Sequence, residues 1–371
     1  MKFAVLEYSS KSGDVWRHTK ETPNYLADPQ TEIDPTSFGC YVSALGGEHV
    51  PLTGLILGPT NRVSKSKQFY RKAVKRLTGS WPSFDIEYLA KFDVLMIVHQ
   101  LSNTQEIISV MQKLRTQPDP PFVIGVPTQP YGQLQIAIEK TPEVETGLRD
   151  FILACDVFIS VVRETVGWYE DLAQTPVVYL PQPYPAAFAG KQFLPLEKKH
   201  TEILVAGVTQ RDNIKQGQIV ARELQKKFPG YLIRLPKVDA YEYDYSELQG
   251  ARYDVLPFEL WRDHLKTLAE TALVVNTDYT LTRGRVQTDC AAVGTPSLGG
   301  NSDGTRDLFP QLRSDSGTST DAIIAKGIRL LSNHEYYQGV VQTAQDRLKM
   351  YDYAESAARL QLLVKKQRQT D

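Results

Sequence analysis

The order of apolar and polar residues along the chain predicts strands that alternate with helices. Short, continuous apolar runs recur, and most are followed by a segment with apolar residues at helical spacing. Continuous runs are typical of strands that are covered on both faces, so we predict parallel sheets between layers of helices. The predicted strands are residues 3–6, 52–57, 94–98, 122–126, 157–161, 177–180, 203–207, 231–235 and 272–276.

A proline-rich stretch divides this series into two. Pro181, Pro183 and Pro185 begin it, and it continues through Pro195 to a charged run at residues 197–200. Such a linker between two apolar strands is typical of a domain junction. We therefore expect one β/α domain over residues 1–185 and another over 201–345, followed by a helical segment at 346–371. A chain of 371 residues suits two domains of ordinary size.

The segment after the strand at 272–276 predicts a phosphate site. It contains Arg283-Gly284-Arg285, then Asp289, and it ends in the turn Gly294-Thr295-Pro296. The amides and dipole at a helix N-terminus attract phosphate, and Gly284 would let the backbone approach it closely. Arg283 and Arg285 add positive charge. Asp289 lies about one turn into the helix, where a carboxylate can accept two hydrogen bonds from a ribose diol. An ordinary β/α connection is the alternative.

This segment resembles the glutamate-to-Gly-Thr-Pro stretch of GT-B glycosyltransferases of the large retaining family (group 1, family 4 type). Asp289 matches the glutamate that holds the nucleotide ribose in that family, and Gly284 matches its loop glycine. The resemblance implies an α/β protein of GT-B fold, with two Rossmann-like β/α/β domains facing an interdomain cleft. It also implies that the first domain binds the acceptor, that the second binds the nucleotide sugar, and that the helix at 346–371 crosses back to the first domain.

The start of the second domain is similar to the family's strand–glycine–basic segment that holds the donor diphosphate. Gly207, Arg211 and Lys215 occupy the matching places. A solvated helix surface is the alternative for the two cations. Backbone amides and basic side chains would neutralise the diphosphate, so we expect no metal, and no cofactor besides the nucleotide sugar as co-substrate. The family's second glutamate, eight residues before Asp289, is replaced by Leu281, which leaves retention or inversion open.

Two residues of the first domain are catalytic candidates. His99 follows the strand at 94–98, where family members often have a histidine near the donor sugar, and a structural histidine is the alternative. Asp14, in the first β/α loop, is a candidate general base, and a loop-capping aspartate is the alternative. Thr128 and Gln129 follow another strand and are candidates to line the cleft.

Charge and composition narrow the possible partners. The formal net charge is −1, which argues against a protein that wraps DNA. A basic segment at 62–76 keeps an anionic acceptor or a membrane surface open, with a solvated helix face as the alternative. No apolar stretch is long enough to span a membrane, and the N-terminus lacks the pattern of a signal peptide. We expect a cytoplasmic protein, peripheral at the membrane if the basic segment binds there. The three cysteines have no metal-site spacing.

The sequence thus predicts a glycosyltransferase of hexosyltransferase type. Its acceptor would be a saccharide, a lipid-linked molecule or another anionic molecule, and DNA is a less favoured acceptor. A nucleotide-sugar 2-epimerase of the same fold and a non-catalytic two-lobed binding protein are the alternatives.

Overall fold

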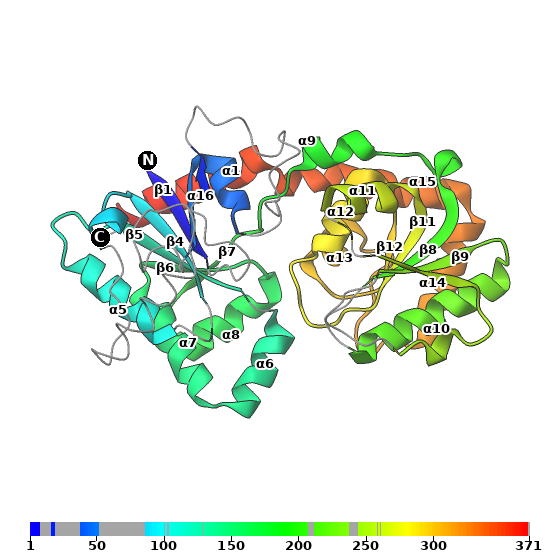
Figure 1. The fold of residues 1–371 in the computed structure, drawn as a ribbon, viewed down its shortest axis with the longest axis horizontal. Helices are drawn as coiled ribbons and strands as arrows, with labels where there is room; N and C mark the ends of the chain where they lie inside the picture. The colour runs from blue at the N-terminus through cyan, green and yellow to red at the C-terminus, as the bar shows by residue number, and fades with distance from the viewer. Residues whose placement is uncertain are drawn as a thin grey trace, which may run out of the picture. The chain divides into compact units, whose positions relative to one another are not determined.

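The computed structural model divides the chain into two compact units (Figure 1). Unit 1 comprises Met1–Pro183 with Tyr353–Asp371, and unit 2 comprises Tyr184–Asp352. The structure describes residues 1–7, 16–18, 38–51, 86–99, 101, 104–128, 130–206, 211–236, 244–257, 259 and 261–369. The predicted strand at 52–57 and the basic segment at 62–76 lie outside these residues.

Unit 1 contains a seven-stranded sheet in the order β2-β3-β1-β4-β5-β6-β7. Neighbouring strands are parallel except for β2, which pairs antiparallel with β3. Every residue of β4 and β5 is buried, as the continuous apolar runs predict. The strands are β1 (Phe3–Glu7), β2 (Trp16–His18), β3 (Gly47–Pro51), β4 (Val94–His99), β5 (Phe122–Pro127), β6 (Val157–Ser160) and β7 (Val177–Tyr179).

The helices of unit 1 come from both ends of the chain. α16 (Tyr353–Gln367) packs against α1 (Cys40–Leu45), and Figure 1 draws these helices in red and blue side by side. Arg368 follows α16, and its guanidinium donates to the carbonyl oxygen of Asp93 at 2.5 Å. The other helices are α4 (Ile86–Leu89), α5 (Thr104–Arg115), α6 (Tyr131–Lys140), α7 (Glu143–Ala154) and α8 (Val166–Ala173).

Unit 2 contains a five-stranded, wholly parallel sheet in the order β10-β9-β8-β11-β12. Its strands are β8 (His200–Ala206), β9 (Leu232–Pro236), β10 (Tyr253–Leu256), β11 (Thr271–Asn276) and β12 (Ser297–Leu298). Its helices are α9 (Ala186–Ala189), α10 (Arg211–Lys227), α11 (Trp261–Glu270), α12 (Arg285–Val293), α13 (Asp303–Leu308), α14 (Thr320–Ser332) and α15 (His334–Leu348). The predicted alternation of strands and helices is confirmed in both units.

The strand order places a switch point in each sheet. In unit 2 the chain moves outward from β8 in one direction through β9 and β10, and in the other through β11 and β12. Ligands of open parallel sheets bind beyond the carboxyl ends of the strands at such a point. In unit 2 this place is bordered by the N-termini of α10 and α12, which follow β8 and β11.

Candidate nucleotide site

The loop that joins β11 to α12 is held by an unusual glycine. Gly284 is the N-cap of α12 and has a φ of +89°, in the left-handed region that favours glycine. A Cβ at Gly284 would lie 2.5 Å from the backbone nitrogen of Gly304 and 2.8 Å from Oγ of Ser302. Only glycine therefore lets the starts of α12 and α13 lie against each other.

Backbone hydrogen bonds fix the same contact. The amides of Asp303 and Gly304 donate to the carbonyl oxygens of Thr282 and Arg283, both at 3.1 Å. The first amides of α13 are thus used inside the protein. The first amides of α12 have no acceptor within their own helix, and they lie at the switch point. Leu281 lies in the same loop with a φ of +54°, an uncommon value for leucine.

Asp289 lies inside unit 2 and anchors two other segments. Its Oδ1 accepts a hydrogen bond from the Tyr184 hydroxyl at 2.8 Å and another from Trp261 Nε1 at 2.9 Å. The residue is 2% exposed, and burial raises the pKa of its carboxyl group, although the guanidinium of Arg285 acts in the opposite direction. Both of these hydrogen bonds are at Oδ1, and within the described part of the chain none is made by Oδ2.

The start of α10 presents the other predicted cations. Arg211 is the first residue of α10, and Lys215 lies one turn further along. Lys215 Nζ forms an ion pair with Asp244 Oδ2 at 3.0 Å, and both side chains are about half exposed. Hydrogen bonds from Ser246, together with Lys215, lower the pKa of Asp244 to about 2. The carboxylate therefore competes with any anion for this lysine.

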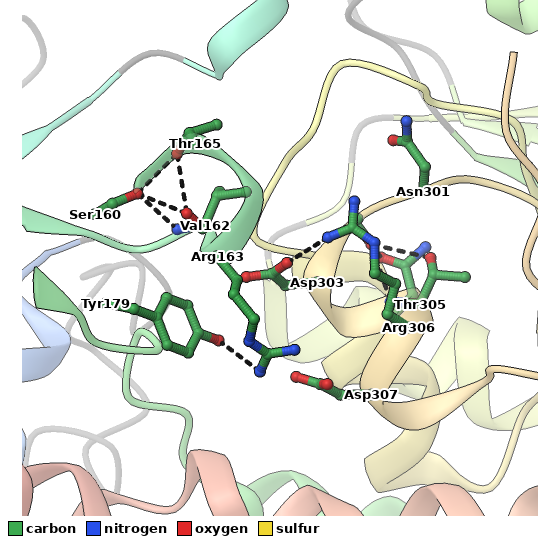
Figure 2. Close-up of polar contacts among 12 residues, drawn as sticks. Ser160, Val162, Arg163, Thr165, Tyr179, Asn301, Asp303, Thr305, Arg306 and Asp307 are labelled. Carbon is green, nitrogen blue, oxygen red and sulfur yellow. Dashed lines mark hydrogen bonds and ion pairs between the residues drawn. The ribbon is translucent and has the colours of Figure 1, made fainter. Parts of the chain in front are cut away.

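α13 begins with a buried ion pair in unit 2. Ser302 caps the helix by accepting from the amide of Thr305, and Arg306 pairs with Asp303 at 2.7 Å (Figure 2). The side chain of Asp303 is 1% exposed and that of Arg306 is 12% exposed. The pair lies within α13, in the helix whose start contacts Gly284, and sequence reasoning missed it.

His99 has an interior position in unit 1. It is the last residue of β4 and is 1% exposed, its Nε2 lies 3.0 Å from Thr104 Oγ1, and its ring lies 4.8 Å from that of Phe151. Burial lowers its pKa from 6.5 to about 4, so the ring is neutral at pH 7. These contacts agree with the structural alternative, and they do not present the ring to a substrate.

A rigid polar turn follows β6 in unit 1, and sequence reasoning missed it as well. Ser160 Oγ lies 2.8 Å from Thr165 Oγ1, and both hydroxyls donate to the carbonyl oxygen of Val162 (Figure 2). The next side chain, Arg163, is exposed and lies over the ring of Tyr179 at 4.8 Å. The turn therefore holds a cation at the carboxyl end of the sheet.

Four predicted site features fall outside the described residues. These are Asp14, Gly207, Gln129 and the side chain of Arg211. Thr128 follows β5 and is partly buried. Among the described residues, no group of three His, Cys, Asp or Glu side chains could hold a metal ion. No described helix is long and apolar enough to cross a membrane.

Solved structures similar to this one span the whole chain. A sucrose-phosphate synthase from Thermosynechococcus elongatus matches with a TM-score of 0.59 at 13% identity and covers 100% of both chains. A trehalose-6-phosphate protein from E. coli bound with UDP-2-fluoro glucose matches with a TM-score of 0.62 at 11% identity, over 100% of this chain and 99% of the other. The chain has the GT-B fold.

Further comparisons agree on the fold and go no further. A UDP-forming trehalose-phosphate synthase from Burkholderia xenovorans matches with a TM-score of 0.59 at 11% identity, over 97% of this chain and 92% of the other. No family model matches the sequence, and a search of curated proteins finds no relative. The α/β class and the GT-B fold predicted from the sequence are confirmed.

Proposed function

We propose that this protein transfers a sugar from a nucleoside diphosphate sugar to an acceptor and that unit 2 binds the donor. The observation that carries the proposal is Gly284, whose left-handed backbone and contact with Gly304 bring the start of α12 to the switch point. A helix N-terminus in this place offers backbone amides and a positive dipole to a diphosphate.

Cations at both helix starts would complete the diphosphate site. Arg283 and Arg285 border Gly284, while Arg211 and Lys215 belong to the first turns of α10, after Gly207. Charge accumulates on the diphosphate as its bond to the sugar breaks, and fixed donors stabilise that charge in the transition state. This arrangement needs no metal ion. Lys215 would exchange Asp244 for a phosphate oxygen, since that ion pair is exposed.

Asp289 would hold the ribose through Oδ2. Its Oδ1 is fixed by Tyr184 and Trp261, so the carboxylate has a set orientation before any ligand arrives. In the first unit we keep Asp14 as the proposed base that faces the acceptor. For His99 we now propose a positioning role between β4 and α5, because its ring is buried.

The neighbours' names and the basic segment of this chain indicate which donors and acceptors to test. The structural neighbours are named for UDP or a UDP-glucose analogue, so a UDP-hexose is the first donor to test. A saccharide is the first acceptor to test. The basic segment at 62–76 keeps anionic acceptors open, and their affinity would fall steeply with salt if this segment binds them.

Calorimetric titration of the full chain with UDP and GDP tests the donor site. Asp289→Asn keeps an oxygen for Tyr184 and Trp261 but places an amide nitrogen where Oδ2 lies. We expect an intact fold and nucleotide affinity lowered at least tenfold, about 1.4 kcal/mol.

Tyr184→Phe is the matched control, because it removes one anchoring bond and leaves Oδ2 in place. We expect this variant to bind nucleotide within about threefold of the unaltered protein, since roughly 0.6 kcal/mol corresponds to that factor. Unchanged affinity in Asp289→Asn would refute the ribose role, and no affinity of the unaltered chain for either nucleotide would refute the proposed donor site.

A further inference from the structure

A cavity of about 480 Å³ lies in unit 2 between the segment Phe193–Leu196 and helix α15. Its volume falls within the range of about 300–1,000 Å³ found for small-molecule sites. It also contacts Gly294, the C-cap of α12. The proposed donor site is at the other end of α12, beside Gly284, about 15 Å away at 1.5 Å per residue. The two places are therefore distinct.

The two walls of this cavity differ in chemistry. One wall is apolar and includes the ring of Phe193, which is 38% exposed. The other is α15, where Gln338, Gln342 and Gln345 follow one another at intervals of four and three residues. This spacing places the three amides on one face of the helix. Each amide can both donate and accept a hydrogen bond.

A glycine in the middle of α15 adds an independent observation. Gly339 lines the cavity, and a Cβ built on it would meet nothing within 4 Å. Glycine weakens a helix interior relative to alanine, and packing inside the protein does not require it here. The missing side chain does, however, allow a ligand in the cavity to approach the backbone of α15 closely.

We infer that this cavity binds a neutral oligosaccharide. A pyranose ring has an apolar C–H face, which suits the exposed ring of Phe193, and a rim of hydroxyls that donate and accept as side-chain amides do. Glu335 adds a carboxylate that accepts from hydroxyls. Within the described chain the lining contains no lysine, arginine or histidine, which disfavours phosphates, nucleotides and nucleic acids.

The test uses the full-length chain and three trisaccharides as probes: maltotriose, cellotriose and chitotriose. Saturation-transfer NMR detects binding, and calorimetric titration gives the dissociation constant. We expect at least one probe to bind and to remain bound when UDP saturates the donor site. If none of the three probes binds at a concentration of about 10 mM, ten times a millimolar dissociation constant, the inference is overturned.

Two variants locate the binding. The double substitution Gln338→Ala with Gln342→Ala removes two exposed amides, and Gly339→Leu adds a large side chain at a lining position where a Cβ meets nothing within 4 Å. Each variant should raise the dissociation constant of the trisaccharide at least tenfold and should keep the thermal midpoint of the unaltered protein. Gln361→Ala, an exposed glutamine of α16, is the control and should bind as the unaltered protein does. Unchanged affinity in both cavity variants would refute the site, whatever the outcome of the nucleotide titration.

Discussion

Acid should destabilise unit 1 through His99. Its pKa is about 4 in the folded protein because the ring is buried, against 6.5 for an unburied histidine. Between these two values the unfolded chain binds a proton that the folded protein does not. The free energy of unfolding therefore falls as the pH drops from 6.5 towards 4, and above 6.5 this contribution is constant.

The size of the effect follows from the shift. One pKa unit corresponds to about 1.4 kcal/mol, so a shift of about two and a half units gives roughly 3 kcal/mol across the window. Such a loss is a large share of the ~5–15 kcal/mol that stabilises a typical domain.

Urea unfolding at several pH values between 4 and 7.5 measures this dependence. His99→Gln keeps a polar partner for Thr104 and does not titrate, so its stability should lose most of the dependence. His200→Gln changes an exposed histidine of unit 2 and serves as the control. Hydrogen exchange at the amides of β4 and β5 separates the response of unit 1 from that of unit 2. Parallel pH profiles for His99→Gln and the unaltered protein would refute the argument.

Four further substitutions, one of them a control, test the backbone and a partly buried cation. Gly284→Ala should lower the free energy of unfolding in urea by about 3 kcal/mol or more, because the new side chain meets both a left-handed φ and a backbone clash. Gly250 has a φ of +81° in open space, so the control Gly250→Ala should lower it by only about 1–2 kcal/mol. Gln174→Gly should stabilise unit 1 by roughly 0.5–1 kcal/mol because Gln174 ends α8 with a φ of +52°; no gain in its urea midpoint would contradict this. Lys199→Met should lower the free energy of unfolding of unit 2 by about 2–4 kcal/mol. The reason is that Lys199 donates to carbonyl oxygens at the ends of α11 and α12 and to a threonine hydroxyl. An unshifted thermal midpoint would show that these bonds contribute little.

The fold could be predicted where apolar runs are continuous. β4, β5 and β11 are wholly buried, and each was visible as an unbroken apolar run. β3 was missed because its sequence, Gly-Glu-His-Val-Pro, has only one aliphatic residue. The spacing of apolar residues predicts a helix from Gln218 to Phe228. α10 begins seven residues earlier, at Arg211, because its first turns contain mostly polar residues.

The site could be predicted only where its parts are neighbours in sequence. Gly284 was identified because a loop glycine before a helix is a local pattern. The partners of Asp289 could not be identified, because Tyr184 and Trp261 are 105 and 28 positions away and meet it only in the folded unit. The same holds for the contact of Gly284 with Gly304, which depends on the turn that starts α13.

The place of α16 in unit 1 has a consequence for synthesis on the ribosome. All of Tyr184–Asp352 must leave the ribosome before Tyr353. Unit 2 can therefore be complete before unit 1, although most of unit 1 precedes it in the sequence. At ~5–20 residues per second, α16 follows β7 by roughly ten to thirty seconds. During this interval the surface of α1 that α16 covers is exposed in the nascent chain. A chaperone that protects newly made chains would find its target there.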